Sequence, residues 1–157
     1  MRRTTIITTA LAATAALAVG PVGGASAKKA TQLDCGLKLF AQGQPNPSGI
    51  QFGFVTCQEP FGNGVHYDEY TVTPTSPGHG TIAATFTNSY DLGTTSGTAA
   101  LTFTATGETS VAYSGTVTYT HGTGKFKQIA GGGTIECTSV DRGAHKSCTV
   151  HSTLTGV

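Results

Sequence analysis

The sequence predicts an all-β protein, an eight-stranded antiparallel up-and-down β-barrel formed by a single domain. Glycine-rich breaks divide the chain into short runs, at a spacing of roughly 10 to 15 residues that is typical of strands joined by turns. Within the runs, β-branched and aromatic residues alternate with threonine, which accounts for 29 of the 157 residues. Beyond residue 27 the chain lacks the start and stop signals of helices.

The first 27 residues are expected to be a signal peptide (1–27). Arg2 and Arg3 precede an apolar run over residues 6–19, and an Ala-Ser-Ala sequence at residues 25–27 supplies the small residues of a cleavage site. This run is short for a bilayer, which takes about 20 apolar residues, so we expect a secreted, extracellular protein without a membrane anchor. The remaining length suits one domain, divided into a tail (28–34) and a barrel (35–157).

The composition argues against nucleic-acid and membrane partners. Charged residues make up 11% of the chain, against about 25% in typical soluble domains. Without Arg2 and Arg3, the chain has 7 Lys and Arg residues against 8 Asp and Glu residues, a formal charge of −1. It therefore offers neither a basic nucleic-acid patch nor a polybasic membrane anchor.

Four cysteines are expected to form two disulfides in an oxidising compartment. They allow three pairings. We favour Cys35 with Cys57 and Cys137 with Cys148, because each pair brackets a strand, a loop and a strand and would staple the open end of a hairpin. Zinc is the competing interpretation, but no pair shows C-x2-C spacing, so we expect no metal site.

The eight strands are expected over residues 35–41, 50–57, 65–73, 80–88, 98–106, 110–120, 132–138 and 147–155. The first expected disulfide joins the first two strands. In the second, Phe52 and Phe54 lie on the opposite face from Cys57, so an inward Cys57 places both rings outside unless a bulge at Gly53 reverses the register. The sequence leaves this open, and two outward rings would form an apolar patch suited to a homo-oligomer.

The third strand has two adjacent carboxylates, Asp68 and Glu69, at its centre. Because side chains alternate, one of them points into a closed barrel. If the threonines of this strand face water, so does Glu69, and the interior receives the other set: His66, Asp68, Tyr70 and Val72. The alternative is that the strand twists at a barrel mouth, where both carboxylates reach water.

The next three strands show the cleanest alternation, with threonine and serine on one face and apolar residues on the other. The apolar sets are Ile82, Ala84 and Phe86; Ala99, Leu101, Phe103 and Ala105; and Val111, Tyr113, Val117 and Tyr119. We expect four aromatic residues of these sets to line a ligand site: Phe86, Phe103, Tyr113 and Tyr119.

A glycine hook precedes the seventh strand. It reads Gly-Thr-Gly-Lys-Phe over residues 122–126 and is followed by three glycines at 131–133. We expect Phe126 to fold back onto the core and the three glycines to allow a bulge. No helix pattern follows, so this is not a phosphate loop. In or near the last two strands we expect Glu136, His145 and His151 to face solvent. We expect His79 and His121, which adjoin glycines, to lie in loops.

This hook resembles that of the allene oxide cyclase and dirigent barrel-like proteins. Exported bacterial members of that group share a GTGxF…GxGT signature, matched here by Gly122, Thr123, Gly124, Phe126, Gly131, Gly133 and Thr134. The resemblance implies an eight-stranded barrel. Where chemistry is known in the group, it implies ring closure or stereochemical guidance of a reactive intermediate, with no metal or organic cofactor.

A barrel is favoured over a two-sheet sandwich because the strands follow one another with short connections. An immunoglobulin-like sandwich is built around a buried tryptophan, and this chain has none. An avidin-like barrel is disfavoured for the same reason, since its ligand pocket uses tryptophans.

Two functions remain open from the sequence. In the first, an exported barrel binds a small apolar molecule in its lumen and acts as a cofactor-free cyclase, isomerase or stereochemical guide. Asp68 would exchange a proton there, because apolar burial disfavours its charged form, with His66 or Tyr70 as partner. In the second, a non-catalytic extracellular protein acts through its surface. An open lumen with a buried Asp68 favours the first; a lumen plugged by side chains favours the second.

Overall fold

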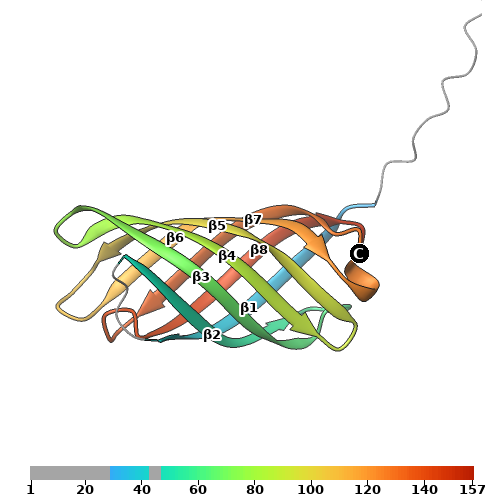
Figure 1. Ribbon diagram of the computed structural model, residues 1–157, viewed down its shortest axis with the longest axis horizontal. Coiled ribbons are helices and arrows are strands. Elements are labelled where there is room, and N and C mark those ends of the chain that lie inside the picture. Colours follow the sequence, from blue (N-terminus) through green and yellow to red (C-terminus); the bar gives the residue numbers. More distant parts are fainter. Residues whose placement is uncertain (1–28, 43–46) are drawn as a thin grey trace, which may run out of the picture.

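The structure is a computed structural model that describes residues 29–42 and 47–157. Eight antiparallel strands follow one another around a closed barrel, and the last pairs with the first (Figure 1). The strands are β1 Thr31–Gln42, β2 Ser48–Cys57, β3 Asn63–Ser76, β4 His79–Tyr90, β5 Gly93–Ala105, β6 Val111–Gly122, β7 Ala130–Ser139 and β8 His145–Thr155. The predicted fold class is confirmed. The predicted signal peptide lies outside the described residues.

Each strand is longer than the sequence predicts. β1 begins at Thr31, among the residues expected to form a tail, and β3 and β4 continue pairing as far as Ser76 with His79. The reason is that in a closed barrel each strand has a neighbour on both sides, including where its residues are polar. The backbone groups of these polar residues also form hydrogen bonds, because that pairing does not depend on the side chain. The hydrophobic pattern reports only the core part of each strand.

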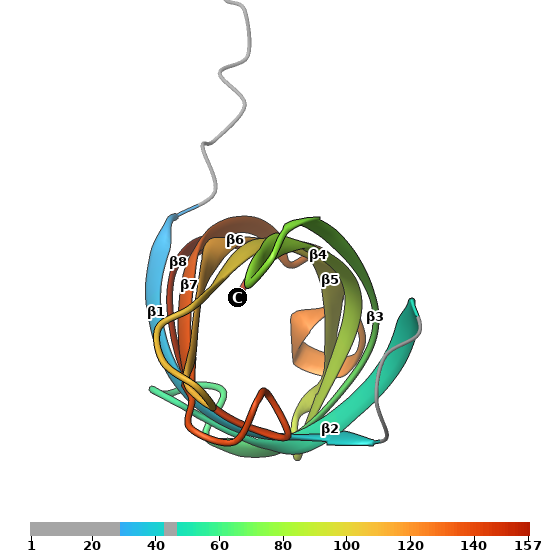
Figure 2. The same cartoon turned by 90° about the vertical axis from the view of Figure 1, so that its left-hand side faces the viewer.

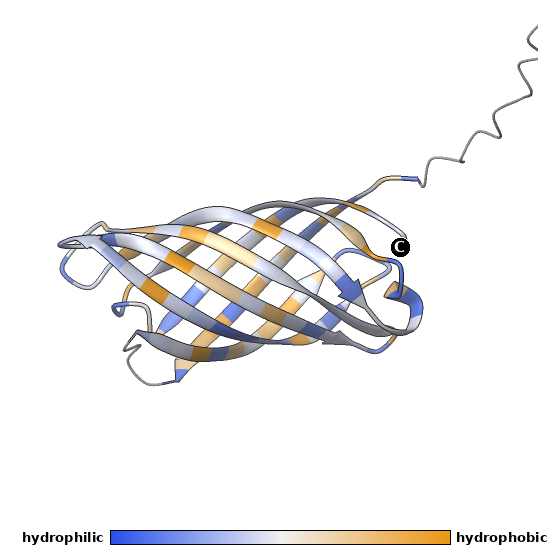
Figure 3. Ribbon diagram, turned by 45° about the horizontal axis from the view of Figure 1, so that its top comes forward, coloured by the Kyte–Doolittle hydropathy of each residue, from blue (hydrophilic) through white to orange (hydrophobic). Residues whose placement is uncertain are grey.

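The barrel interior is apolar and its outside is largely polar, which follows from the alternation along each strand. In Figure 3 apolar and polar segments alternate along the ribbons. On β1, for example, the alternate residues Leu33, Cys35, Leu37 and Leu39 are buried, while Asp34, Gly36 and Lys38 between them are exposed. The described helical segments include none that is long and apolar enough to cross a membrane.

The glycine hook closes one end of the barrel. It contains a short 3-10 helix, η1 Gly124–Phe126, which lies at the same end as the C-terminus (Figure 1). Phe126 is fully buried and stacks on Phe61 with the ring centroids 4.4 Å apart. The predicted return of Phe126 to the core is confirmed. We call the opposite end, formed by the β3–β4, β5–β6 and β7–β8 turns, the mouth; Figure 2 looks into the barrel from this end.

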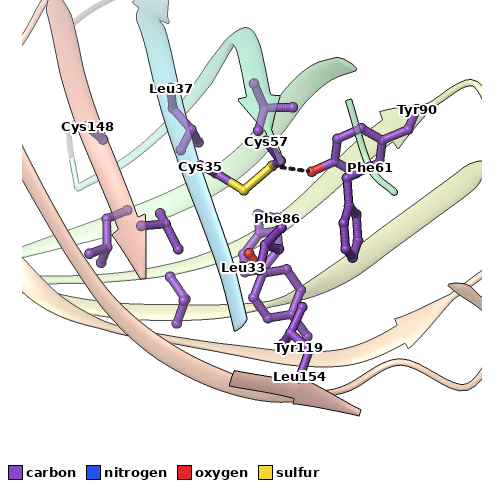
Figure 4. Close-up of a cluster of buried hydrophobic side chains, with 14 of the residues drawn as sticks. Leu33, Cys35, Leu37, Cys57, Phe61, Phe86, Tyr90, Tyr119, Cys148 and Leu154 are labelled. Carbon is purple, nitrogen blue, oxygen red and sulfur yellow. Dashed lines mark hydrogen bonds between the residues drawn. A yellow bond between two sulfur atoms is a disulfide. The ribbon is translucent and has the colours of Figure 1, made fainter. Parts of the chain in front are cut away.

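Both disulfides have the favoured pairing. Cys35 and Cys57 are directly opposite each other on β1 and β2, and Cys137 and Cys148 are opposite on β7 and β8. Figure 4 shows the first of them beside Tyr90, whose hydroxyl lies 3.4 Å from Cys57 Sγ. Only this first disulfide staples the open end of its hairpin. The second is next to the β7–β8 turn, so the expectation that it closes the open end is wrong.

The second strand has no bulge, and its phenylalanines face outward. Pairing of β2 with both neighbours is regular through Gly53. A Cβ at Gly53 would come 2.9 Å from the backbone of Leu39, so the close approach of β1 holds this inward position as glycine. Phe52 is 51% exposed and Phe54 is 63% exposed. With Phe40 they form an aromatic cluster on the outer wall.

Candidate active site in the barrel interior

The third strand has the register derived from its threonines. His66, Asp68 and Tyr70 are buried, and Asp68 is only 3% exposed. Glu69 points outward, where its Oε1 accepts a 3.0 Å hydrogen bond from the Tyr67 hydroxyl. The strand therefore places one of its two adjacent carboxylates inside the barrel.

The two oxygens of Asp68 have different surroundings. Oδ2 accepts a 2.6 Å hydrogen bond from Gln51 Nε2 and lies 2.8 Å from His66 Nε2. Oδ1 is buried and has no hydrogen-bond partner among the described residues. A buried carboxylate oxygen without a partner is costly, so Oδ1 is the atom of this group that is open to a donor from outside the protein.

His66 is held in place by a second amide. Its Nδ1 lies 2.7 Å from Asn88 Oδ1, while Asn88 Nδ2 donates to Thr95 Oγ1 at 3.4 Å. Because the Asn88 oxygen is an acceptor, His66 Nδ1 is the donor of this hydrogen bond. The proton between His66 Nε2 and Asp68 Oδ2 can then reside on either atom. This arrangement can pass a proton between the two side chains.

Lys146 of β8 continues the polar network towards the mouth. Its Nζ donates a 2.8 Å hydrogen bond to Gln51 Oε1 and lies 5.5 and 5.6 Å from the ring centroids of Tyr70 and Tyr113. The side chain is only 9% exposed. Burial lowers the pKa of the Lys146 ammonium, and the nearby charge of Asp68 opposes this effect.

The free space inside the barrel has two parts. A lumen cavity of about 50 Å³ is lined by Asp68, His66 and apolar side chains. A second pocket, of about 180 Å³, lies at the mouth and is lined by Phe103 and residues of the β7–β8 turn. We call it the mouth pocket. Four residues line both spaces: Tyr70, Ile82, Tyr113 and Lys146.

These volumes set what each space can hold. A dry cavity of about 150 Å³ accepts a benzene ring, and a water molecule needs about 10 to 15 Å³. The lumen cavity therefore has room for a few water-sized groups, and the mouth pocket has room for a ring. Side chains fill most of the lumen, so a larger ligand reaches Asp68 only if Tyr70, Tyr113 or Lys146 moves.

The four aromatic residues predicted to bind a ligand all point inward, in two separate pairs. Phe86 packs edge-on against Tyr119 in the lumen, with the centroids 5.4 Å apart. Phe103 and Tyr113 lie 6.4 Å apart at the mouth. Desolvation raises the pKa of both Tyr113 and Tyr119 to about 12, so both hydroxyls are neutral at physiological pH.

The other polar residues considered from the sequence lie outside the barrel. Glu136 and the four remaining histidines are exposed. His79 and His121 lie at the ends of β4 and β6, so the expectation that they lie in loops is wrong, because these strands continue beyond their apolar cores. Two of these histidines contact carboxylates: His145 contacts Asp141, and His151 Nδ1 lies 2.6 Å from Asp34 Oδ1. Across residues 29–42 and 47–157, no group of three His, Cys, Asp or Glu side chains is close enough to hold a metal ion.

Sequence reasoning missed three members of the interior network: Gln51, Asn88 and Lys146. The signal was present, because each of them lies an even number of residues from a residue expected inside and so points to the same face of its strand. Gln51 shares its face with Cys57, Asn88 with Phe86, and Lys146 with Cys148. Single polar residues in otherwise apolar sets form no motif, so nothing singled them out.

No protein-family model matches the chain. No curated protein matches it either. Among solved structures, one described as pyocyanin demethylase is similar, with 15% sequence identity and a TM-score of 0.42 over 78% of this chain and 99% of that chain.

Proposed function

We propose that the protein is an exported barrel that binds a small, largely apolar molecule and acts on it without a cofactor, as an isomerase or cyclase. Two disulfides are typical of proteins that work in an oxidising compartment, which supports export. The observation that supports the chemistry is Asp68 Oδ1, a buried carboxylate oxygen that has no hydrogen-bond partner within residues 29–42 and 47–157, in a wall of the lumen cavity. Such an atom is suited to accept a proton or a hydrogen bond from a ligand.

The interior network provides what a proton-transfer reaction needs. Asp68 would remove a proton from one atom of the ligand through Oδ1 and return it to another, which balances an isomerisation without any co-reactant. His66, which contacts Oδ2, would stabilise the Asp68 carboxyl group both with and without the proton. The apolar walls exclude water and strengthen these interactions. The resemblance of the glycine hook to the allene oxide cyclase and dirigent group is in line with this class of reaction.

The alternative is a non-catalytic extracellular protein that acts through its surface. The small volume of the lumen cavity, about 50 Å³, favours it. So does the outer aromatic cluster of Phe40, Phe52 and Phe54, which is suited to pairing with another surface, such as a second copy of this chain. In this case the polar network would serve only to fix the packing of the barrel interior.

A ligand search separates the two functions. Native mass spectrometry of the protein from culture medium should show a co-purifying small molecule if the barrel binds one. Asp68→Asn keeps the shape of the side chain and removes its basicity, so turnover of that molecule should fall by at least about 100-fold. Glu69→Gln, the same change on the adjacent outward residue, is the control and should leave turnover unchanged.

Either of two results would contradict the enzymatic proposal. One is turnover that survives Asp68→Asn. The other is a series of protein preparations with no bound molecule, combined with failure to bind the neutral dye Nile red. The second result would leave the surface function as the better interpretation.

A further inference from the structure

Lys146 is a buried cation with no carboxylate in salt-bridge contact among the residues that the structure describes. An ammonium group has three N–H donors, and Gln51 Oε1 accepts one of them. In the described part of the chain, no salt bridge includes Lys146. A buried charge is normally paired, because its desolvation is costly. The rings of Tyr70 and Tyr113 compensate part of that cost and leave donors free.

The nearby carboxylates form their hydrogen bonds with groups other than Lys146. Asp68 accepts from Gln51 and contacts His66, both through Oδ2. Asp141 accepts hydrogen bonds from Ser139 and His145, which hold its pKa well below its usual range and keep it ionised. Neither carboxylate is in direct contact with Lys146 Nζ, so a ligand anion can bind there.

Lys146 also stands at the junction of the two spaces, where it forms part of the inner wall of the mouth pocket. The other walls of this pocket are largely apolar and include the rings of Phe103 and Tyr113. Arg142, an exposed residue of the β7–β8 turn, adds a second cation at the rim. A cation at the bottom and apolar walls above it suit a ligand with an anionic head and an apolar body.

The turn that carries Arg142 is held by backbone hydrogen bonds. Arg142 N donates to Thr109 O at 2.7 Å, and Ala41 N donates to Ala144 O at 2.8 Å. These bonds tie the β7–β8 turn to the β5–β6 turn and to the end of β1. The pocket is therefore formed before any ligand arrives, which reduces the entropic cost of binding.

We propose that the mouth pocket binds a small organic anion, a carboxylate attached to a ring-sized apolar body. The carboxylate lies on Lys146 Nζ, and the body packs against Phe103 and Tyr113. This assignment rests on the proposed small-molecule function and names its ligand class. The volume of about 180 Å³ fits one ring, with larger bodies extending out through the mouth.

Calorimetric titration of the protein with both disulfides formed tests the assignment. Benzoate is the probe, benzyl alcohol is its neutral counterpart, and inorganic phosphate has charge without an apolar body. We expect benzoate to bind at least 10-fold more tightly than benzyl alcohol, and phosphate not to compete with it. Lys146→Met should remove this 10-fold preference and leave benzyl alcohol binding unchanged. Lys125→Met, at an exposed lysine of η1 at the closed end, is the charge-matched control and should bind benzoate as the unaltered protein does.

A second measurement needs no variant that has to fold. In protein with carbon-13-labelled lysine, benzoate should shift the Cε resonance of Lys146 and should leave the Cε resonances of the other described lysines unchanged. Equal affinity for benzoate and benzyl alcohol, or an unshifted Lys146 resonance at saturation, overturns the assignment to Lys146. The proposed function fails by different results, namely the absence of any co-purifying molecule or full turnover in Asp68→Asn, so the two failures are distinguishable.

Discussion

At the scale of single residues, Gln51 joins the two charged groups of the interior. Its oxygen accepts from Lys146, which has only donors, and its nitrogen donates to Asp68. These partners fix the orientation of the amide, and a carboxamide is the side chain that offers a donor and an acceptor at the same reach. Gln51 therefore acts as a positioning residue for Asp68.

Replacement of Gln51 by leucine should destabilise the protein. Gln51→Leu leaves Lys146 Nζ and Asp68 Oδ2 each without one hydrogen bond in a buried site, at a cost of about 2 to 4 kcal/mol in the free energy of unfolding. Gln32→Leu is the control, because Gln32 is exposed and accepts only from Thr153, and it should change stability by about 0.5 kcal/mol or less. Guanidinium unfolding followed by circular dichroism measures both. Equal effects of the two changes would show that the interior network contributes nothing specific.

The inward position of Asp68 could be predicted because it depends only on alternation along one strand. Its partners could not, because they depend on register between strands. Asp68 meets Gln51 directly across the β2–β3 pair, and His66 meets Asn88 across β3–β4. A shift of two residues in either pairing would keep every side chain on its face and still separate these groups.

At the scale of the strands, inward aromatic residues face glycines. Where the neighbouring strand has a glycine, the missing side chain leaves space, and the ring lies over that backbone. Cross-strand pairs of this kind are Gly49 with Tyr70, Gly64 with Tyr90, Gly80 with Phe103 and Gly97 with Phe86. This arrangement allows large rings to fit inside a barrel of only eight strands.

One of these pairs offers a direct test. A Cβ at Gly64 would lie 2.7 Å from Tyr90 Cδ1 and 2.5 Å from the backbone oxygen of Ser89, so Gly64→Ala forces the ring and the strand apart. We expect a loss of about 1 to 3 kcal/mol, as in other overpacked cores. Gly36→Ala is the matched control, because nothing lies within 4 Å of its Cβ position, and it should be neutral or slightly stabilising. If urea unfolding midpoints fall equally for both, packing against the ring is not the reason for the glycine.

At the scale of the whole molecule, closure depends on the pairing of β1 with β8, which joins opposite ends of the described chain. The two disulfides lie in the hairpins on either side of this pairing. Their sequence separations of 22 and 11 residues correspond to about 3 kcal/mol each by loop entropy. Each disulfide thus stabilises one of the two hairpins whose outer strands, β1 and β8, pair to close the barrel.

The class, strand count and order of the barrel could be predicted because they follow from local alternation and short turns. The direction of Phe52 and Phe54 could not, since a bulge at Gly53 was equally compatible with the sequence. The structure shows why no bulge forms: Gly53 is needed for the close approach of β1. The second disulfide lies beside its turn because Cys137 and Cys148 are close to the end of β7 at Ser139 and the start of β8 at His145. The expected strand bounds, 132–138 and 147–155, already place both cysteines at this turn.

The interior tyrosines make alkaline pH a probe of the intact barrel. Desolvation raises the pKa of Tyr113 and Tyr119 from 10.0 to about 12. Between pH 10 and 12 the unfolded chain loses these protons while the folded barrel keeps them, so stability falls as pH rises, by about 1.4 kcal/mol per pH unit for each proton that differs. Lys146 acts in the opposite direction, because its pKa is lower in the folded protein than in the unfolded chain and stability therefore rises with pH. This effect is limited to pH values below 10.5, the pKa of lysine in the unfolded chain. Above that pH the tyrosine effect stands alone.

Absorbance at about 295 nm follows tyrosinate formation and checks this directly. The native protein should ionise later than the same protein in concentrated urea, where all tyrosines return to a pKa of about 10. Tyr119→Phe should remove one late-titrating group and reduce the fall in stability between pH 10 and 12. Tyr67→Phe, at an exposed position on the outer wall where the hydrogen bond to Glu69 raises the pKa of the hydroxyl, should reduce that fall in stability by less than Tyr119→Phe does. Coincident native and unfolded titration curves would mean that water reaches these hydroxyls, and a barrel open to water could not provide the dry interior that the proposed chemistry at Asp68 requires.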